Sequence, residues 1–188
     1  KFLRSRDVKA IIVACNTAST QTEESEYENT PVYNVITPGA LLATQLTQNN
    51  KIAVLATRAT IKANSYTKHI HKNLPTAEVY TQACPLFVPL AEEGWTDDPI
   101  TNLIAFCYLQ NIKSADVDTV VLGCTHYPLL KKSIEKVFGN HVKLVESGEA
   151  IALLLKEDFN TQKLVRNSQN QAQNLTVALT DSSEHFEH

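Results

Sequence analysis

Two stretches of the sequence have the same form: residues 10–17 read AIIVACNT, and residues 119–126 read TVVLGCTH. In each, a run of apolar residues leads to a small residue, a cysteine, and then a threonine beside a second polar residue. A third stretch, residues 52–57, reads IAVLAT and has threonine where the other two have cysteine. Short apolar runs that end in polar residues are typical of buried β-strands followed by loops. The repeated form therefore predicts strands that present a cysteine or threonine where they end.

Seven strand-like runs, rich in valine, isoleucine and leucine, alternate with helical patterns along the chain. The runs show little polar alternation, as expected of parallel strands that are buried on both faces. Alternation of strands and helices predicts an α/β fold, with mainly parallel sheets flanked by helices and right-handed crossovers. The predicted strands are residues 9–14, 32–36, 51–56, 78–81, 118–123, 142–145 and 175–180.

Apolar residues at helical spacing predict amphipathic helices between these strands. One apolar stripe consists of Ala59, Ala63, Tyr66 and Ile70, and another of Leu130, Ile134 and Val137. Pro128 suits the first turn of the second helix, because proline is tolerated where the backbone N–H has no helical partner. Residues 160–174 form the most polar segment, and we expect a solvated helix or loop there.

Composition limits the classes of protein to which the chain can belong. It has 188 residues, a net charge of −3 and 43% hydrophobic residues, which is ordinary for a globular protein with a sizeable core. The weak acidity does not favour binding to nucleic acid. The longest apolar runs are far shorter than the roughly 18 residues that cross a bilayer. The sequence does not begin with a secretory signal, so we expect a cytoplasmic protein. Because it contains no methionine, we also expect the chain to be part of a longer protein.

The sequence lacks the usual signatures of cofactor and metal sites. Its five glycines form neither a GxGxxG motif nor a P-loop, so nucleotide cofactors are not expected. No CxxC pair is present, and a cysteine two residues before a histidine is a weak metal signal on its own. We therefore expect no cofactor, no bound metal and four free cysteines.

Three interpretations of the cysteines remain open at this point. Most cysteines at strand ends are packing residues. Ligands of open α/β sheets, however, bind at the carboxyl ends of strands, where both Cys15 and Cys124 are placed. A thiol titrates close enough to neutrality to act as a base, so two thiols on opposite faces of a small acid could invert it without a cofactor. A single Cys124/His126 nucleophile is the competing assignment.

Several motifs, in order along the whole chain, resemble those of bacterial glutamate racemases. The two cysteine motifs are residues 13–19, VACNTAS, and residues 122–130, LGCTHYPLL, and their cysteines are 109 positions apart. The other matching stretches are residues 37–40, TPGA; 84–90, CPLFVPL; 147–150, SGEA; and 180–182, TDS.

The resemblance implies a cofactor-independent enzyme that interconverts L- and D-glutamate and supplies D-glutamate for peptidoglycan synthesis. Cys15 would serve the D-enantiomer and Cys124 the L-enantiomer, each alternating between base and acid. The substrate-binding residues would be Asn16, Thr17, Thr125 and His126. Glu92 matches an acidic residue with a supporting role, although a solvated surface glutamate is the simpler interpretation. Cys84 and Cys107 are assigned to packing.

The resemblance also implies two similar α/β domains with the active site in the cleft between them. Residues 37–150 would form one domain, and residues 1–36 and 151–188 would form parts of the other. We expect the family's first strands, with an Asp-Ser and a Tyr-Gly pair, to precede Lys1. A homodimer is implied. The alternatives are a sister racemase for aspartate or another small acid, and a non-catalytic interaction protein on the same fold.

Overall fold

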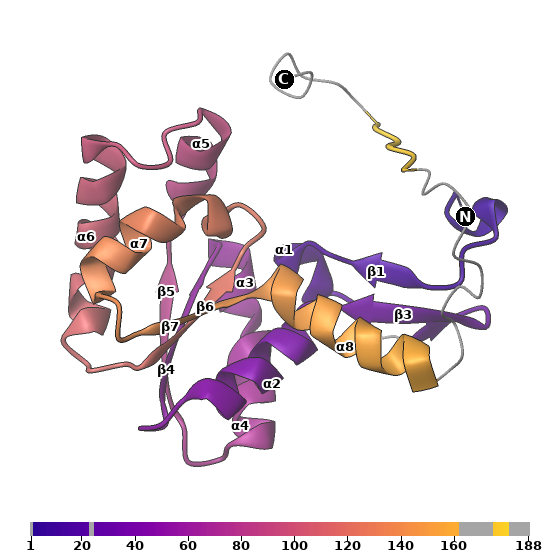
Figure 1. The fold of residues 1–188 in the computed structure, drawn as a ribbon, viewed down its shortest axis with the longest axis horizontal. Coiled ribbons are helices and arrows are strands. Elements are labelled where there is room, and N and C mark those ends of the chain that lie inside the picture. Colours follow the sequence, from indigo (N-terminus) through magenta and orange to yellow (C-terminus); the bar gives the residue numbers. More distant parts are fainter. Residues whose placement is uncertain (1, 23–24, 162–174, 181–188) are drawn as a thin grey trace.

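The computed structural model describes residues 2–22, 25–161 and 175–180, which fold into two sheets flanked by helices (Figure 1). The larger sheet has four parallel strands in the order β5-β4-β6-β7. The smaller sheet has the order β1-β3-β2, with β1 parallel and β2 antiparallel to β3. The strands are β1 (Ile11–Val13), β2 (Glu26–Tyr27), β3 (Thr30–Asn34), β4 (Lys51–Ala56), β5 (Glu78–Ala83), β6 (Thr119–Gly123) and β7 (Lys143–Glu146). The predicted α/β fold with mainly parallel sheets is confirmed.

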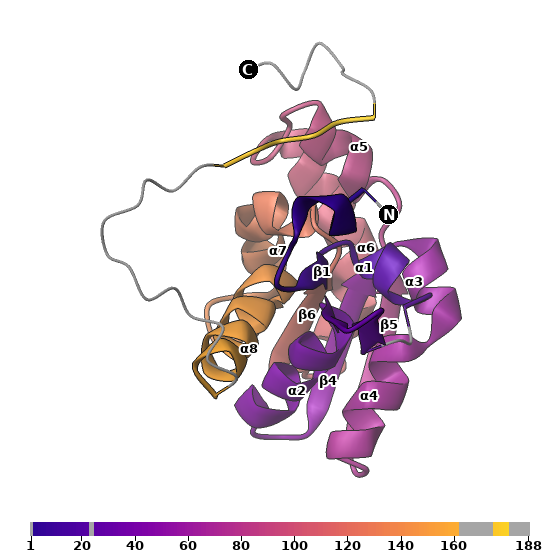
Figure 2. The ribbon, with the colours of Figure 1, turned by 90° about the vertical axis from the view of Figure 1, so that its right-hand side faces the viewer.

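Helices cover both faces of the larger sheet (Figures 1 and 2). The helices α5, α6 and α7 pack on one face, and α2 and α4 on the other. The helical elements are η1 (Arg4–Arg6), α1 (Asn16–Ser19), α2 (Ile36–Leu46), α3 (Arg58–Ala63), α4 (Ser65–Asn73), α5 (Phe87–Glu92), α6 (Pro99–Lys113), η2 (Tyr127–Leu130), α7 (Lys131–Phe138) and α8 (Ser147–Thr161). No helix among the described residues is both long and apolar enough to cross a bilayer.

The strand β4 explains why the sequence predicted a parallel sheet. Successive side chains of a strand point to opposite faces. Ala53 and Leu55 lie in the core beneath α5, α6 and α7, whereas Ile52 and Val54 lie in the core beneath α2 and α4. Because both faces are buried, every position from Ile52 to Ala56 is apolar, and these residues form a continuous hydrophobic run.

Two of the predicted strands are wrong in part or entirely. The strand predicted at residues 32–36 ends at Asn34, and Ile36 begins α2. The Asn34 carboxamide oxygen accepts hydrogen bonds from the backbone N–H groups of Ile36 and Thr37, both at 3.1 Å, and this turn ends the strand. Residues 175–180 are described but form no strand, and their side chains are exposed. The short strand β2 was not predicted. Most of the polar segment at residues 160–174 lies outside the described residues.

The helix predicted over residues 59–70 is two helices, α3 and α4. Asn64 has φ 56°, in the left-handed region, so it ends α3 and precedes α4. Asparagine tolerates this conformation better than most residues, because its short polar side chain can bond locally. Tyr66 and Ile70 are buried as predicted, but Ala59 is exposed. The stripe formed by Leu130, Ile134 and Val137 is buried against the sheet, which confirms the second predicted helix.

Asp118 ties the turn after α2 to the start of β6, and its replacement by asparagine is expected to destabilise the fold. Its carboxylate accepts hydrogen bonds from Thr47 Oγ1 at 2.6 Å and from the backbone N–H groups of Gln48 and Asn49 at 2.6 and 2.8 Å. Burial acts to raise the pKa of Asp118, but these hydrogen bonds outweigh burial and lower it. Replacing the carboxylate by a carboxamide should cost about 2 kcal/mol in the free energy of unfolding at pH 7, measured with urea.

The pH dependence of that loss follows from the direction of the shift. A carboxyl group whose pKa is lowered on folding contributes its full stability above the unfolded pKa of about 3.9. The contribution disappears as the pH falls through the lower, folded value. The difference between parent and Asp118→Asn should therefore shrink below about pH 4. Asp116→Asn, a neighbouring exposed position, should leave stability nearly unchanged. Equal losses at pH 7 and pH 3 would contradict the assignment.

Candidate active site

The two predicted catalytic residues follow parallel strands of different sheets. Cys15 comes after β1, is exposed and caps the N-terminus of α1. Cys124 comes directly after β6 and is only 7% exposed. Figures 1 and 2 both show α1 beside α3, the helix that follows the neighbouring strand β4. The topology therefore brings the Cys15 loop to the edge of the larger sheet at which Cys124 lies.

The Cys124 thiol responds electrostatically to Cys15. Burial raises the pKa of Cys124, and negative charge on Cys15 raises it further. The backbone N–H groups of His126 and Tyr127 and the Thr125 side chain act in the opposite direction. Two like charges disfavour each other at short range, so a charge on Cys15 disfavours the Cys124 thiolate.

His126 lies between Cys124 and a carboxylate. Its Nδ1 is 3.8 Å from Cys124 Sγ and 3.5 Å from Thr125 Oγ1, and its Nε2 is 3.2 Å from Glu92 Oε1. Because an ionised carboxylate only accepts hydrogen bonds, the Nε2 proton is directed at Glu92. The Nδ1 atom is then available to accept a proton from the Cys124 thiol or return it. Glu92, for which a solvated position was the simpler prediction, contacts the site through this pair.

Asn16 is almost fully buried and has a hydrogen-bond donor left over. Its Oδ1 accepts from the Tyr66 hydroxyl at 2.5 Å and from Ser147 Oγ at 3.0 Å. Its Nδ2 has no hydrogen-bond partner among the described residues, although the side chain is 1% exposed. Buried amide groups are nearly always paired. The free N–H groups beside Cys15 therefore suit a ligand that carries an acceptor, such as a carboxylate.

Thr17 belongs to a triangle of three hydroxyl groups, and Thr17 is the member that the sequence predicted as a site residue. Thr17, Thr57 and Thr60 each have Oγ1 3.0 Å from the other two. The signal for Thr57 was present in the third repeated stretch, where threonine replaces cysteine. The register of the sheet explains why the stretches around Thr57 and Cys124 are alike. Ala56 pairs with Gly123, so Thr57 and Cys124 are the first residues after two adjacent strands and lie at the same edge of the sheet. Thr60 follows one turn later on α3.

The remaining cysteines lie outside this cluster, and all four thiols are free. Cys84 is fully buried in the core, which confirms its assignment to packing, and burial raises its pKa. Cys107, assigned to packing as well, is exposed on α6, so that prediction is wrong. It falls on the outer side of α6, whereas Ala105, Leu109 and Ile112 face the core. No group of three metal-binding side chains occurs among the described residues.

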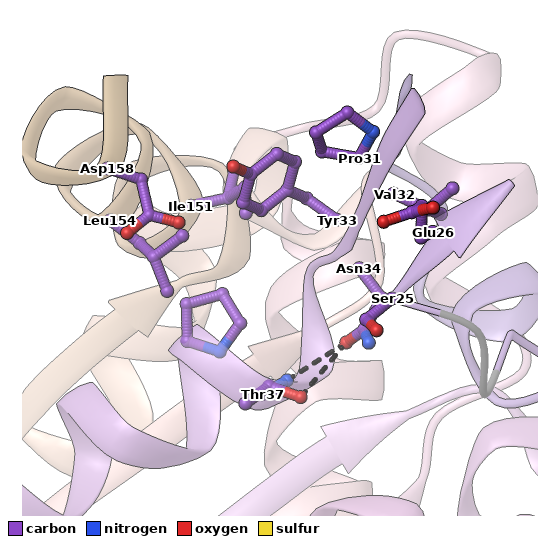
Figure 3. Close-up of a pocket in the computed structure, with 11 residues that line it drawn as sticks. Ser25, Glu26, Pro31, Val32, Tyr33, Asn34, Thr37, Ile151, Leu154 and Asp158 are labelled. Carbon is purple, nitrogen blue, oxygen red and sulfur yellow. Dashed lines mark hydrogen bonds between the residues drawn. The ribbon is translucent and has the colours of Figure 1, made fainter. Parts of the chain in front are cut away.

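A cavity of about 450 Å³ lies elsewhere, between β3 and α8 (Figure 3). Its lining includes Tyr33, Ile151 and Leu154, and its charged groups are the carboxylates of Glu26 and Asp158. Among the described residues, its lining includes no cysteine and no cationic side chain. The two carboxylates make this cavity a poor site for a negatively charged ligand.

Comparisons with known proteins point to one family. Residues 1–155 match the family model described as Asp/Glu/Hydantoin racemase. A glutamate racemase of Geobacter metallireducens is 47% identical over 167 residues, which cover 88% of this chain. The crystal structure of glutamate racemase isoform RacE1 from Bacillus anthracis superposes with a TM-score of 0.85 at 34% identity, over 90% of the chain. Glutamate racemase from Francisella tularensis in complex with D-glutamate gives 0.81 at 38% identity, also over 90% of the chain.

The match extends over most of this chain but over a smaller part of its relatives. The chain spans 62% of the length of the Geobacter protein and 64% of each of the two crystallised chains. Since the family model covers more than four fifths of the 188 residues, the chain belongs to the Asp/Glu/hydantoin racemase family.

Proposed function

We propose that this chain contributes the two thiols of a cofactor-independent racemase that interconverts L- and D-glutamate. The observation that carries the proposal is the placement of Cys15 and Cys124 at the carboxyl ends of parallel strands from different sheets, close enough for charge on one to raise the pKa of the other. Two acid/base groups on opposite faces of a carbon centre can invert it, because one removes a proton while the other supplies one. A single Cys124/His126 nucleophile does not account for Cys15 and its polar neighbours.

In the proposed reaction one thiolate removes the α-hydrogen of glutamate as a proton, so that a C–H bond breaks and an S–H bond forms. The opposite thiol then gives its proton to the other face of the carbon, and its S–H bond breaks as the new C–H bond forms. No electrons are gained or lost overall, and the sulfur that was a thiolate ends as a thiol. Burial favours the protonated form of Cys124 at rest. Cys124 can therefore act as the acid when Cys15 acts as the base.

The polar groups around the thiols suit an amino acid with two carboxylates. The free Asn16 Nδ2 and the Thr17, Thr57 and Thr60 hydroxyls can donate to a carboxylate. Thr125 and His126 border the other thiol. The glutamate named for the relatives, including D-glutamate in the Francisella complex, supports glutamate over aspartate. Asn16, Thr17, Thr125 and His126 are proposed as substrate-binding residues.

The wider setting of the enzyme is proposed on the same basis. Residues 37–150 would form one domain, and residues 1–36 with 151–188 would belong to another, with the substrate between them. The intact protein would be a cytoplasmic homodimer that supplies D-glutamate for peptidoglycan. Closure of the domains would exclude water and bring both thiols against the α-carbon.

Exchange of the α-hydrogen tests this function. The intact protein, without pyridoxal phosphate, is incubated with L-glutamate in D₂O, and loss of the α-proton NMR signal is followed together with formation of D-glutamate. We expect both to proceed. Exchange with aspartate but not glutamate would retain the chemistry and change the substrate. No exchange with either would exclude the racemase and favour a non-catalytic interaction protein.

A further inference from the structure

A buried cluster of three hydroxyl and amide side chains joins segments that are far apart in the sequence. Tyr66 comes from α4, Ser147 from the first position of α8 and Asn16 from α1, and all are nearly inaccessible to solvent. The Tyr66 hydroxyl and Ser147 Oγ are 3.0 Å apart, and both lie within hydrogen-bond distance of Asn16 Oδ1. Buried networks of this kind rigidify the groups they connect when every acceptor is satisfied.

This cluster connects the backbone beside one thiol to the backbone beside the other. Asn16 directly follows Cys15. Ser147 Oγ lies 3.0 Å from Asn16 Oδ1 and also 3.2 Å from the carbonyl oxygen of Leu122, two residues before Cys124. Its single proton is shared between these two acceptors. A path of two hydrogen bonds therefore runs between the two cysteine loops through Ser147.

The ring of Tyr66 contacts the same loop from the other side. A Cβ atom at Gly123, which directly precedes Cys124, would lie 3.2 Å from Tyr66 Cε2 and 2.9 Å from the carbonyl oxygen of Leu55. A Cβ atom at Gly39 would lie 3.2 Å from the Tyr66 hydroxyl oxygen. Glycine at both positions lets the ring approach the backbone closely. Burial raises the pKa of Tyr66 far above its ordinary value, so its hydroxyl stays protonated and donates to Asn16.

We propose that Tyr66 and Ser147 are positioning residues that set the separation of the two thiols and the orientation of the Asn16 amide. The inference rests on the proposed two-thiol function and extends it to residues that touch neither the sulfurs nor the substrate. Tyr66 holds Asn16 through its hydroxyl and the Cys124 loop through its ring. Ser147 bonds to both loops. With Asn16 Oδ1 held by two donors, its Nδ2 faces away from them and is kept for the ligand.

The test uses Tyr66→Phe and Ser147→Ala, singly and together, in the intact protein. Phenylalanine keeps the ring against Gly123 and removes only the hydroxyl. Each single variant should lower kcat/KM for glutamate about tenfold per folded molecule, and it should move the limb of the pH profile that reports Cys124 to lower pH. Because both hydroxyls act on Asn16 Oδ1, the double variant should lose little more than either single one. Tyr80→Phe, which removes a hydroxyl bonded to Glu78 on β5, is the matched control and should be fully active.

A second readout does not depend on racemase activity. The pH midpoint for alkylation of Cys124 by iodoacetamide is measured by mass spectrometry with Cys15 present and with Cys15→Ala. The midpoint should be higher with Cys15 present, and this difference should be lost in Tyr66→Phe and in Ser147→Ala. Unchanged kcat/KM and unchanged coupling in these variants would overturn the inference. So would losses that multiply in the double variant, or that follow only the fraction of unfolded protein. The parent protein could lack racemase activity while the effect of Cys15 on the Cys124 alkylation midpoint still depends on Tyr66. That result would refute the proposed function but not the positioning role of Tyr66.

Discussion

Replacing either Cys15 or Cys124 by alanine is expected to abolish racemisation in both directions, with kcat/KM falling by at least about 10³-fold. The physical reason is that each direction needs a base on one face of the α-carbon and an acid on the other. Alanine can act neither as an acid nor as a base. Formation of D-glutamate from L-glutamate and the reverse reaction should be measured by chiral chromatography, so that an effect on one direction only would be seen.

Cys107→Ala provides the matched control for this experiment. Cys107 is an exposed, free thiol on α6, so its removal tests whether the loss of any accessible cysteine affects the assay. It should leave kcat and KM unchanged, and thermal unfolding should show that all three variants fold. If one of the two active-site variants kept more than a tenth of the parent activity in both directions, the two-thiol mechanism would be wrong. A one-cysteine mechanism that uses Cys124 and His126 would then be the better account.

The sequence predicted best where local pattern and tertiary environment agree. Residues 51–56 form β4 with the predicted bounds, because burial on both faces of a parallel sheet demands an unbroken apolar run. The stripe containing Ile134 was equally clear, since one face of α7 meets the core and the other meets solvent. The strand-end position of both cysteines followed from the same reasoning. For these elements, the positions of the apolar residues in the sequence are enough to predict which side chains are buried.

Prediction failed where a single residue or a distant contact decides the local structure. The apolar spacing from Ala59 to Ile70 is helical throughout, and only the left-handed Asn64 divides it. Strand β2 is two residues long and exposed, so it carries no hydrophobic pattern. Thr60 joins the site through hydroxyl contacts with Thr17, 43 positions away. Such long-range hydrogen bonds leave no periodic trace in the sequence.

The pairing of Glu92 with His126 is the clearest case of a site contact that the sequence could not provide. Glu92 ends α5 as one of two consecutive glutamates, and only the family resemblance, not the local sequence pattern, distinguishes it from Glu93. In the fold, the contacts between α5 and η2 bring Glu92 within 3.2 Å of the imidazole. This geometry gives the two glutamates different roles, which mutation can separate.

Replacing His126 by alanine is expected to lower kcat about 10²-fold and to move the alkylation midpoint of Cys124 to higher pH. Burial already raises the pKa of Cys124, and the His126 imidazole is a side-chain hydrogen-bond partner of its sulfur, with Nδ1 3.8 Å away. Without the imidazole the thiolate loses that partner, so the pKa of Cys124 should rise further. Alkylation of the exposed thiol of Cys107 in the same sample should be unchanged, which provides an internal control.

Glu92→Gln should have a smaller effect of the same sign, because the glutamate side chain is 61% exposed and its charge is screened by water and salt. Its effect on kcat should be a few-fold, greatest at low ionic strength, while Glu93→Gln should have none. If the two glutamine variants behaved alike, the Glu92–His126 contact would have no part in proton transfer. If His126→Ala left the Cys124 midpoint unchanged, His126 would act on the substrate rather than on the thiol.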